Sequence, residues 1–116
     1  MSRLLAFTLA LLVPFLAHAD LQSARDAQAR GDLQAAFTEY RRLAEAGDPV
    51  AQVNLAYMYY VGEGVDQSYP EAVNWNRKAA VQGDRDAQYN LAVAYAFGEG
   101  IKQDLKEAAT WYRRSA

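Results

Sequence analysis

The feature that most constrains the fold of this chain is an internal repeat with a period of 36 residues. When residues 47–80 are aligned with residues 83–116, 17 of the 34 positions are identical. Ordinary composition gives about one identity in fifteen by chance. A period of this length indicates stacked supersecondary units that bury their apolar faces against one another. The sequence therefore predicts a repeat solenoid.

Each repeat has the pattern of two helices separated by a glycine-rich bend. In the first repeat, Ala51, Leu55 and Tyr59 recur every four residues, and Trp75 belongs to a second apolar stripe at helical spacing. A Gly-Glu-Gly bend at residues 62–64 lies between the stripes and recurs in the second repeat. We therefore expect helices near residues 48–60, 69–82, 84–96 and 105–115.

The predicted helix ends carry residues that suit them. Gly-Asp pairs at residues 47–48 and 83–84 combine a glycine that can close one helix in the left-handed conformation with an aspartate that can cap the next. Pro49 fits the first helical position, where no N–H is needed. Ser-x-x-Glu at residues 68–71 and Asp-x-x-Glu at residues 104–107 predict capping boxes, in which each partner bonds the other's backbone N–H group.

Residues 20–46 have the pattern of a third, degenerate unit. Its alanines align with those of the repeats at the same spacing of 36 residues, but its bend is shortened to Gly31 and Asp32. We expect two tightly joined helices near residues 21–30 and 33–46, similar to a tetratricopeptide hairpin. The chain is then all-α, with six helices in three antiparallel hairpins.

The N-terminus has the pattern of a cleaved secretory signal peptide. Arg3 precedes an uncharged apolar run over residues 4–16, and the Ala-His-Ala that follows offers the small side chains that signal peptidase accepts. We expect residues 1–19 to be removed between Ala19 and Asp20, which leaves 97 residues in the periplasm or outside a bacterial cell. The run is shorter than the ~20 residues of a membrane-spanning helix. An uncleaved signal anchor stays open as the alternative.

The composition points away from catalysis and from nucleic acids. The only histidine, His18, lies in the predicted signal peptide, and the chain has no cysteine. The mature chain therefore offers neither imidazole nor thiol as a nucleophile, base or zinc ligand, and we expect no catalytic residue, metal or cofactor. Its eleven basic and fourteen acidic residues argue against nucleic acid or an anionic membrane as a partner. Carboxylate pairs such as Asp84 and Asp86 leave a glycan-cleaving enzyme open.

The motif Ala-Gln-x-Asn-Leu-Ala-x-x-Tyr-x-x-Gly-Glu-Gly-[Val/Ile], followed by Glu-Ala-x-x-Trp, is similar to the Sel1-like repeat family over residues 47–116. The resemblance implies a short right-handed α–α solenoid of the tetratricopeptide type, with repeats at residues 47–82 and 83–116. It also implies a non-enzymatic adaptor, of a kind often found in bacterial envelope assemblies. Residues 20–46 depart from the pattern in their short bend.

Positions that differ between the two repeats are those that the scaffold leaves free for binding specificity. By resemblance to tetratricopeptide arrays, the first helix of each repeat lines a concave groove. The candidate groove residues on these helices are Val53, Tyr57, Tyr60, Tyr89, Val93 and Phe97. Such an apolar, aromatic groove suits a peptide or protein partner. The alternative for the two valines is packing against the neighbouring unit.

Three other features have a structural and a functional interpretation. Trp75 and Trp111 share one register on the packing stripe, so we expect core residues rather than ligand-stacking ones. Asn54 and Asn90 are expected to tie each hairpin together, with a bond to a bound peptide as the alternative. A helix at residues 105–116 that nothing covers predicts self-association or partner docking through that helix.

Three functions therefore stay open, in order of preference. The first is an exported interaction module that binds an unknown protein or peptide in its groove. The second is a signal-anchored subunit of a cell-envelope assembly. The third is a carboxylate-dependent enzyme that acts on cell-wall glycan.

Overall fold

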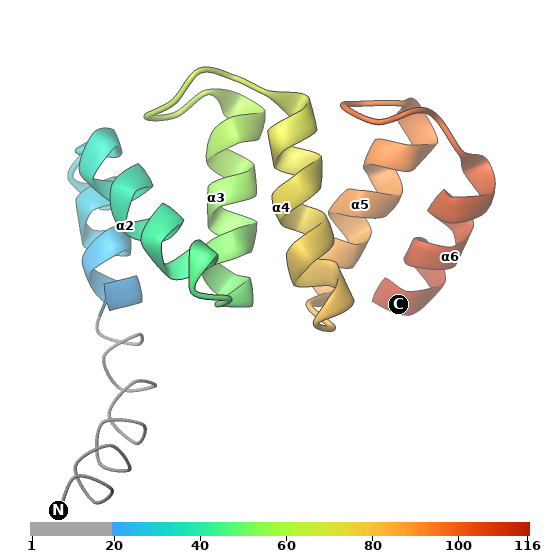
Figure 1. The fold of residues 1–116 in the computed structure, drawn as a ribbon, viewed down its shortest axis with the longest axis horizontal. Helices are drawn as coiled ribbons and strands as arrows, with labels where there is room; N and C mark the ends of the chain where they lie inside the picture. The colour runs from blue at the N-terminus through green and yellow to red at the C-terminus, as the bar shows by residue number, and fades with distance from the viewer. Residues whose placement is uncertain (1–19) are drawn as a thin grey trace, which may run out of the picture.

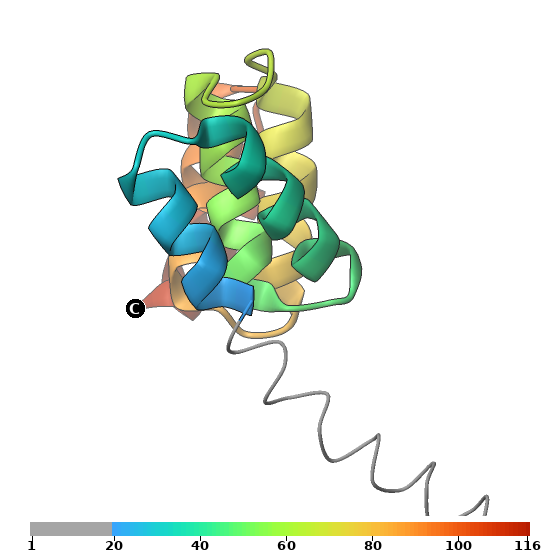
Figure 2. The ribbon, with the colours of Figure 1, turned by 90° about the vertical axis from the view of Figure 1, so that its left-hand side faces the viewer.

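The chain forms a row of three helix hairpins, as the computed structural model shows for the residues that it describes, 20–116 (Figure 1). The paired helices are residues 20–29 with α2 (Leu33–Glu45), α3 (Pro49–Val61) with α4 (Tyr69–Val81), and α5 (Arg85–Phe97) with α6 (Leu105–Ser115). Figure 2 shows the first hairpin lying across one end of this row. The predicted signal peptide, residues 1–19, lies outside the described residues.

This arrangement confirms the predicted all-α solenoid. Each helix begins and ends within one residue of the range that the sequence predicts. From α2 to α4 to α6, and from α3 to α5, corresponding helices start 36 residues apart, so the sequence period is also the structural period over this part of the chain. In the described part of the chain, no helix is both long enough and apolar enough to cross a membrane.

The predicted Gly-Asp boundaries form as expected. The Asp48 carboxylate accepts hydrogen bonds from the N–H groups of Val50 and Ala51, at 2.8 and 3.2 Å. Asp84 caps α5 in the same way. The glycine before each aspartate has a positive φ, near +100°, which a residue with a side chain rarely adopts. These local signals fix where α3 and α5 begin.

In each of the two predicted capping boxes, only one of the two expected hydrogen bonds forms. Ser68 Oγ accepts a bond from the N–H of Glu71, as predicted. The N–H of Ser68, however, donates to the carbonyl of Tyr59 at 2.8 Å, and Asp104 donates to Tyr95 in the same way. The predicted return bond from the cap N–H to the glutamate is therefore wrong. The bend brings each cap against the last turns of the preceding helix, where a backbone carbonyl takes that N–H instead.

The glycines of the bends also allow close packing between hairpins. A side chain at Gly64 would collide with the carbonyl group of Leu33, at the start of α2. A side chain at Gly100 would collide with the backbone of Tyr69, at the start of α4. Each Gly-Glu-Gly bend therefore lies directly on the second helix of the preceding hairpin.

At the end of each junction that lies opposite the glycine bend, a buried glutamine joins one hairpin to the preceding one. Gln52 and Gln88 are nearly inaccessible to solvent. Their side-chain amides donate to the carbonyls of Ala44 and Ala80, each at 3.1 Å, in the last turn of the preceding hairpin. A buried amide without these bonds would be costly, so the recurring glutamine has a structural reason.

The predicted tryptophans lie in the core, as expected. Trp75 belongs to a core cluster that also holds Tyr40 and Met58, and Trp111 to a second cluster around Leu91. Both tryptophan residues are more than 90% buried. The outer face of each ring is covered by a cationic side chain from the same helix, Lys78 over Trp75 and Arg114 over Trp111. The tryptophans are therefore packing residues.

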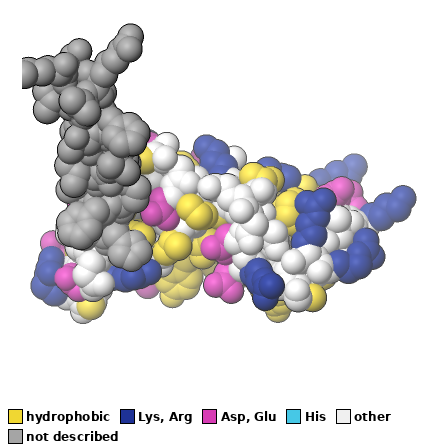
Figure 3. Space-filling model, turned by 90° about the horizontal axis from the view of Figure 1, so that it is seen from below, with side chains coloured by type: hydrophobic (Ala, Val, Ile, Leu, Met, Phe, Trp, Pro, Cys, Tyr) yellow, Lys and Arg dark blue, Asp and Glu magenta, His cyan; other side chains and the backbone are white. Residues whose placement is uncertain are grey.

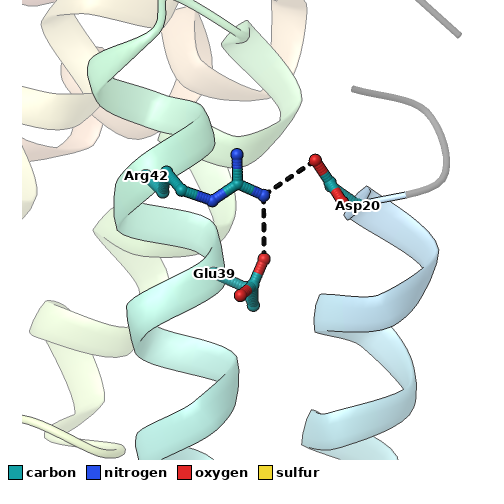
Figure 4. A network of polar contacts seen from close by, with 3 residues as sticks. All are labelled: Asp20, Glu39 and Arg42. Atoms are coloured by element: carbon teal, nitrogen blue, oxygen red, sulfur yellow. Dashed lines mark hydrogen bonds and ion pairs between the residues drawn. The ribbon is translucent and has the colours of Figure 1, made fainter. Parts of the chain in front are cut away.

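An ion-pair network on the surface connects the two helices of the first hairpin (Figure 4). The Arg42 guanidinium lies 2.7 Å from the Asp20 carboxylate and 3.0 Å from Glu39. The hydrogen bond to Asp20 is the main reason that the pKa of Arg42 is raised. Because these side chains are exposed to solvent, the pairs contribute at most about 1 kcal/mol. Asp20, the first residue after the predicted cleavage site, is therefore part of the fold.

Candidate functional site

A pocket of about 400 Å³ opens between α3, α4 and α5, and Glu99 of the bend after α5 also lines it. Its walls are mainly apolar and aromatic. Four tyrosines line it, Tyr57, Tyr60, Tyr69 and Tyr89, together with alanines and valines of the three helices. A pocket of this size and character is typical of a ligand-binding site.

Four of the six candidate groove residues come together in this pocket. Tyr57 and Tyr60 reach it from α3, and Tyr89 and Val93 reach it from α5. Tyr57 and Tyr89 are 51% and 55% exposed, so much of each ring faces solvent. The geometry fits the predicted groove, and the binding role of these residues stays a prediction.

The other two candidates lie outside the pocket. Val53 is partly buried and packs against the second core cluster, among alanines of α4 and α5. The alternative interpretation, in which this valine packs against the neighbouring unit, therefore describes it better. Phe97 is 71% exposed at the end of α5 but does not line the pocket. Its position leaves it available as a separate contact surface.

Tyr69, which begins α4, also lines the pocket, although it was not among the predicted groove residues. Its ring stacks on that of Tyr60, with 5.1 Å between the ring centroids and 25° between the planes. The corresponding residue in the second repeat is Leu105. Tyr69 therefore differs between the repeats, which is the signal that predicts specificity, but it lies on the second helix of its repeat, and the predicted groove residues are all on first helices.

The sequence pattern placed Glu99 in the recurring Gly-Glu-Gly bend and did not assign it to the groove, yet Glu99 lines the pocket. The backbone N–H of Glu99 donates to Ala94 at the end of α5, and the adjacent Gly100 lies on the backbone of Tyr69. These contacts place the carboxylate beside Tyr60, whose hydroxyl donates to Oε2 at 3.2 Å. The negative charge of Glu99 and this bond raise the pKa of Tyr60. The phenol therefore stays a hydrogen-bond donor at neutral pH.

The asparagines behave differently in the two repeats. The Asn90 amide donates to Asn76 Oδ1 at 3.5 Å, which joins α5 to α4 of the preceding hairpin, so the prediction that Asn90 ties its own hairpin together is wrong. Asn54 instead donates to the carbonyl of Val50 in its own helix, so the same prediction is wrong for it. Asn76 and Asn90 both line the pocket. Their mutual bond is long and weak, which leaves both amides able to bind a ligand.

The pocket can bind by hydrogen bonds, aromatic contacts and one negative charge. Its polar groups are tyrosine hydroxyls, two asparagine amides and the Glu99 carboxylate, and no basic side chain lines it. Within residues 20–116, no three potential ligands among His, Cys, Asp and Glu gather where they could hold a metal ion. The arrangement therefore suits recognition of a ligand by shape and charge.

The family follows from a direct comparison with known repeats. Residues 49–84 and 85–116 each match the model of the Sel1 repeat. The chain belongs to the Sel1 repeat family. Sel1 repeats generally serve as protein–protein interaction modules. The matched repeats contain all of α3 to α6 and therefore the whole pocket.

Two solved structures resemble this Sel1 repeat chain in sequence and fold. A Sel1 repeat protein from Oxalobacter formigenes is 36% identical, with a TM-score of 0.70 over 72% of this chain. The c5321 protein, a protective antigen present in uropathogenic Escherichia coli strains, displays an SLR fold and is 32% identical, with a TM-score of 0.82 over 90% of this chain. The chain spans only 24% and 23% of the lengths of these proteins.

A third structure shares the fold alone. Cysteine rich protein B of Helicobacter pylori is 16% identical, with a TM-score of 0.68 over 85% of each chain. The present chain has no cysteine, so its Sel1 hairpins are held together by packing and hydrogen bonds without disulfides. A comparison with curated proteins gave no match.

Proposed function

We propose that this Sel1 repeat chain is an exported, non-enzymatic interaction module that binds a peptide or protein partner in the tyrosine-lined pocket. The observation that carries the proposal is the exposure of Tyr57 and Tyr89 around a preformed pocket of about 400 Å³. Aromatic side chains in such pockets often dominate the energy of binding. They also lose little conformational entropy when a partner covers them.

Capture of partners from a cell-envelope lysate tests this proposal. The double variant Tyr57→Ala, Tyr89→Ala removes two exposed rings of the pocket and should lose most of the captured protein, as identified by mass spectrometry. Phe97→Ala is the matched control, because it removes an exposed aromatic ring outside the pocket. Circular dichroism confirms that each variant is folded.

The outcome distinguishes two surfaces. If the double variant captures the same proteins as the wild type, the pocket is not the binding site. If Phe97→Ala alone loses them, the partner binds at the end of α5 instead.

Export rests on the sequence pattern of residues 1–19, with a basic residue, an apolar run and a small-x-small cleavage site. N-terminal sequencing of the protein from the periplasm or the medium should begin at Asp20. A chain that keeps Met1 and stays with the membrane fraction would favour the signal-anchored subunit.

A further inference from the structure

We propose that the pocket recognises a lysine or arginine side chain of its partner. The inference rests on the proposed function and adds the chemistry of the group that is bound. Of the residues that line the pocket, Glu99 is the only charged one, and it is negative. The faces of the four tyrosine rings also carry negative charge density, which attracts a cation within about 6 Å of a ring centroid.

The aromatic walls are held in place before any ligand arrives. Tyr60 and Tyr69 stack on each other at 5.1 Å. On the α5 side, the ring of Tyr89 is braced by an edge-to-face contact with Tyr112 of α6, at 5.7 Å. Rings that are already positioned lose less freedom on binding, which favours affinity.

The Glu99 carboxylate is available to an incoming cation. One of its oxygens accepts a bond from the Tyr60 hydroxyl, which orients the group. The ion pairs that the structure shows within residues 20–116 all belong to the first hairpin, so no basic side chain of these residues forms an ion pair with Glu99. A carboxylate can accept further hydrogen bonds from a guanidinium or ammonium group.

Two cationic side chains of α4 are engaged in contacts outside the pocket. Arg77 donates to the hydroxyl of Tyr95 at 2.9 Å and lies over its ring, and Lys78 covers Trp75. Figure 3 shows further basic side chains gathered toward the α6 end of the molecule. None of these residues lines the pocket, so the cationic group is left for the partner to supply.

Other occupants fit the pocket less well. An acidic group would be repelled by Glu99, and a purely apolar one would remove water from this carboxylate without replacing its hydrogen bonds. A basic side chain satisfies the carboxylate and the rings together. The amides of Asn76 and Asn90, whose mutual bond is long, keep further donors and acceptors that can bond the backbone beside the bound residue.

Two blocked pentapeptides test the inference. One carries lysine between two leucines with glycine at each end, and the other carries norleucine in place of lysine, which keeps the alkyl chain and removes the charge. Binding is followed by the NMR signals of the tyrosine rings during titration. We expect the lysine peptide to bind at least roughly tenfold more tightly than the norleucine peptide.

Glu99→Gln should remove this preference for lysine, whereas Glu63→Gln should keep it. Glu63 is the matched control because it lies in the same Gly-Glu-Gly sequence of the first repeat and does not line the pocket. The first variant loses the charge at the pocket, and the second loses an equal charge away from it.

Three results would overturn the inference. The first is equal or tighter binding of the norleucine peptide. The second is a titration in which neither peptide shifts the pocket tyrosines. The third is binding of free choline without binding of the lysine peptide, which would assign the pocket to a quaternary ammonium ligand. The proposed function fails separately, through unchanged capture by the Tyr57→Ala, Tyr89→Ala variant.

Discussion

The two junctions between successive hairpins have the same backbone plan but different contents. At the first junction, Tyr40 of α2 and Met58 of α3 are completely buried and fill the space. The residues 36 positions later are Asn76 of α4 and Ala94 of α5, and both line the pocket of about 400 Å³. The first junction is filled by buried side chains, whereas the second contains the candidate binding pocket.

The contrast shows how a repeat scaffold makes a pocket. Gln52 and Gln88 join the hairpins at one end of each junction, and Gly64 and Gly100 allow contact at the other end. Because these connections are the same at both junctions, the hairpin spacing does not depend on the volume of the side chains between them. Smaller side chains therefore leave a space instead of bringing the helices together.

The largest effect is expected from removing a side chain of the filled junction. Tyr40→Ala should lower the free energy of unfolding by about 3–5 kcal/mol, the range for a buried aromatic side chain. Asn76→Ala, at the equivalent position, should lower it by less than about 1 kcal/mol, because that side chain borders the pocket. Urea denaturation followed by circular dichroism measures both. Equal losses would show that the two junctions are packed alike.

The next effect concerns the contact that both junctions share. Gly64→Ala and Gly100→Ala each place a methyl group against backbone atoms, in addition to requiring a positive φ. Gly83→Ala is the matched control, because it has a positive φ but open space around it. The control should lose about 1–2 kcal/mol, and the two bend variants should each lose about 1–3 kcal/mol more. A bend variant as stable as the control would mean that the bend moves away easily.

Transferring the first junction's side chains to the second should close the pocket. In the double variant Asn76→Tyr, Ala94→Met, we expect the lysine peptide to bind at least roughly tenfold more weakly, because its site is occupied. The free energy of unfolding should change by no more than about 1.5 kcal/mol. Val81→Met, on an exposed position of α4 outside the pocket, is the control. Unchanged peptide binding in the double variant would contradict the role of these two positions.

The smallest effect is on the titration of Tyr60. Glu99→Gln should lower the pKa of Tyr60 toward the ordinary value for tyrosine, because it removes the charge and the bond that raise it. A raised pKa means that the folded state holds this proton more tightly. The stabilising contribution is thus complete below about pH 10 and is lost as the pH rises through the folded pKa.

Ring-carbon NMR of labelled tyrosine measures this titration. Glu63→Gln should leave the pKa of Tyr60 unchanged, because the first bend does not reach the pocket. The same pKa in the wild type and in Glu99→Gln would show that Glu99 does not act on Tyr60 in solution.

Local signals account for what could be predicted of the fold. Asp48 and Asp84 cap the helices that follow them because the bond from cap to backbone spans only two or three residues. The capping boxes were predicted less well. The carbonyl that takes the N–H of Ser68 belongs to Tyr59, in the preceding helix, and the local pattern does not include it.

The site could be predicted only in part. Tyr57 and Tyr89 were found because variable positions on a repeat scaffold tend to carry specificity. Tyr69 and Glu99 were not assigned to the site, because they reach it from the start of α4 and from the bend after α5. Their convergence with residues of α3 was therefore visible only in three dimensions.

The sequence alone determined the helices, their caps and the stacking of hairpins, because these depend on contacts at short or repeated spacing. The tertiary structure alone decided which junction is filled and which is open. That outcome depends on the combined volume of side chains from different helices, such as Tyr40 with Met58 or Asn76 with Ala94. The tertiary structure also decided the charge of the pocket, because the bend after α5 brings Glu99 to Tyr60, a contact between residues 39 positions apart.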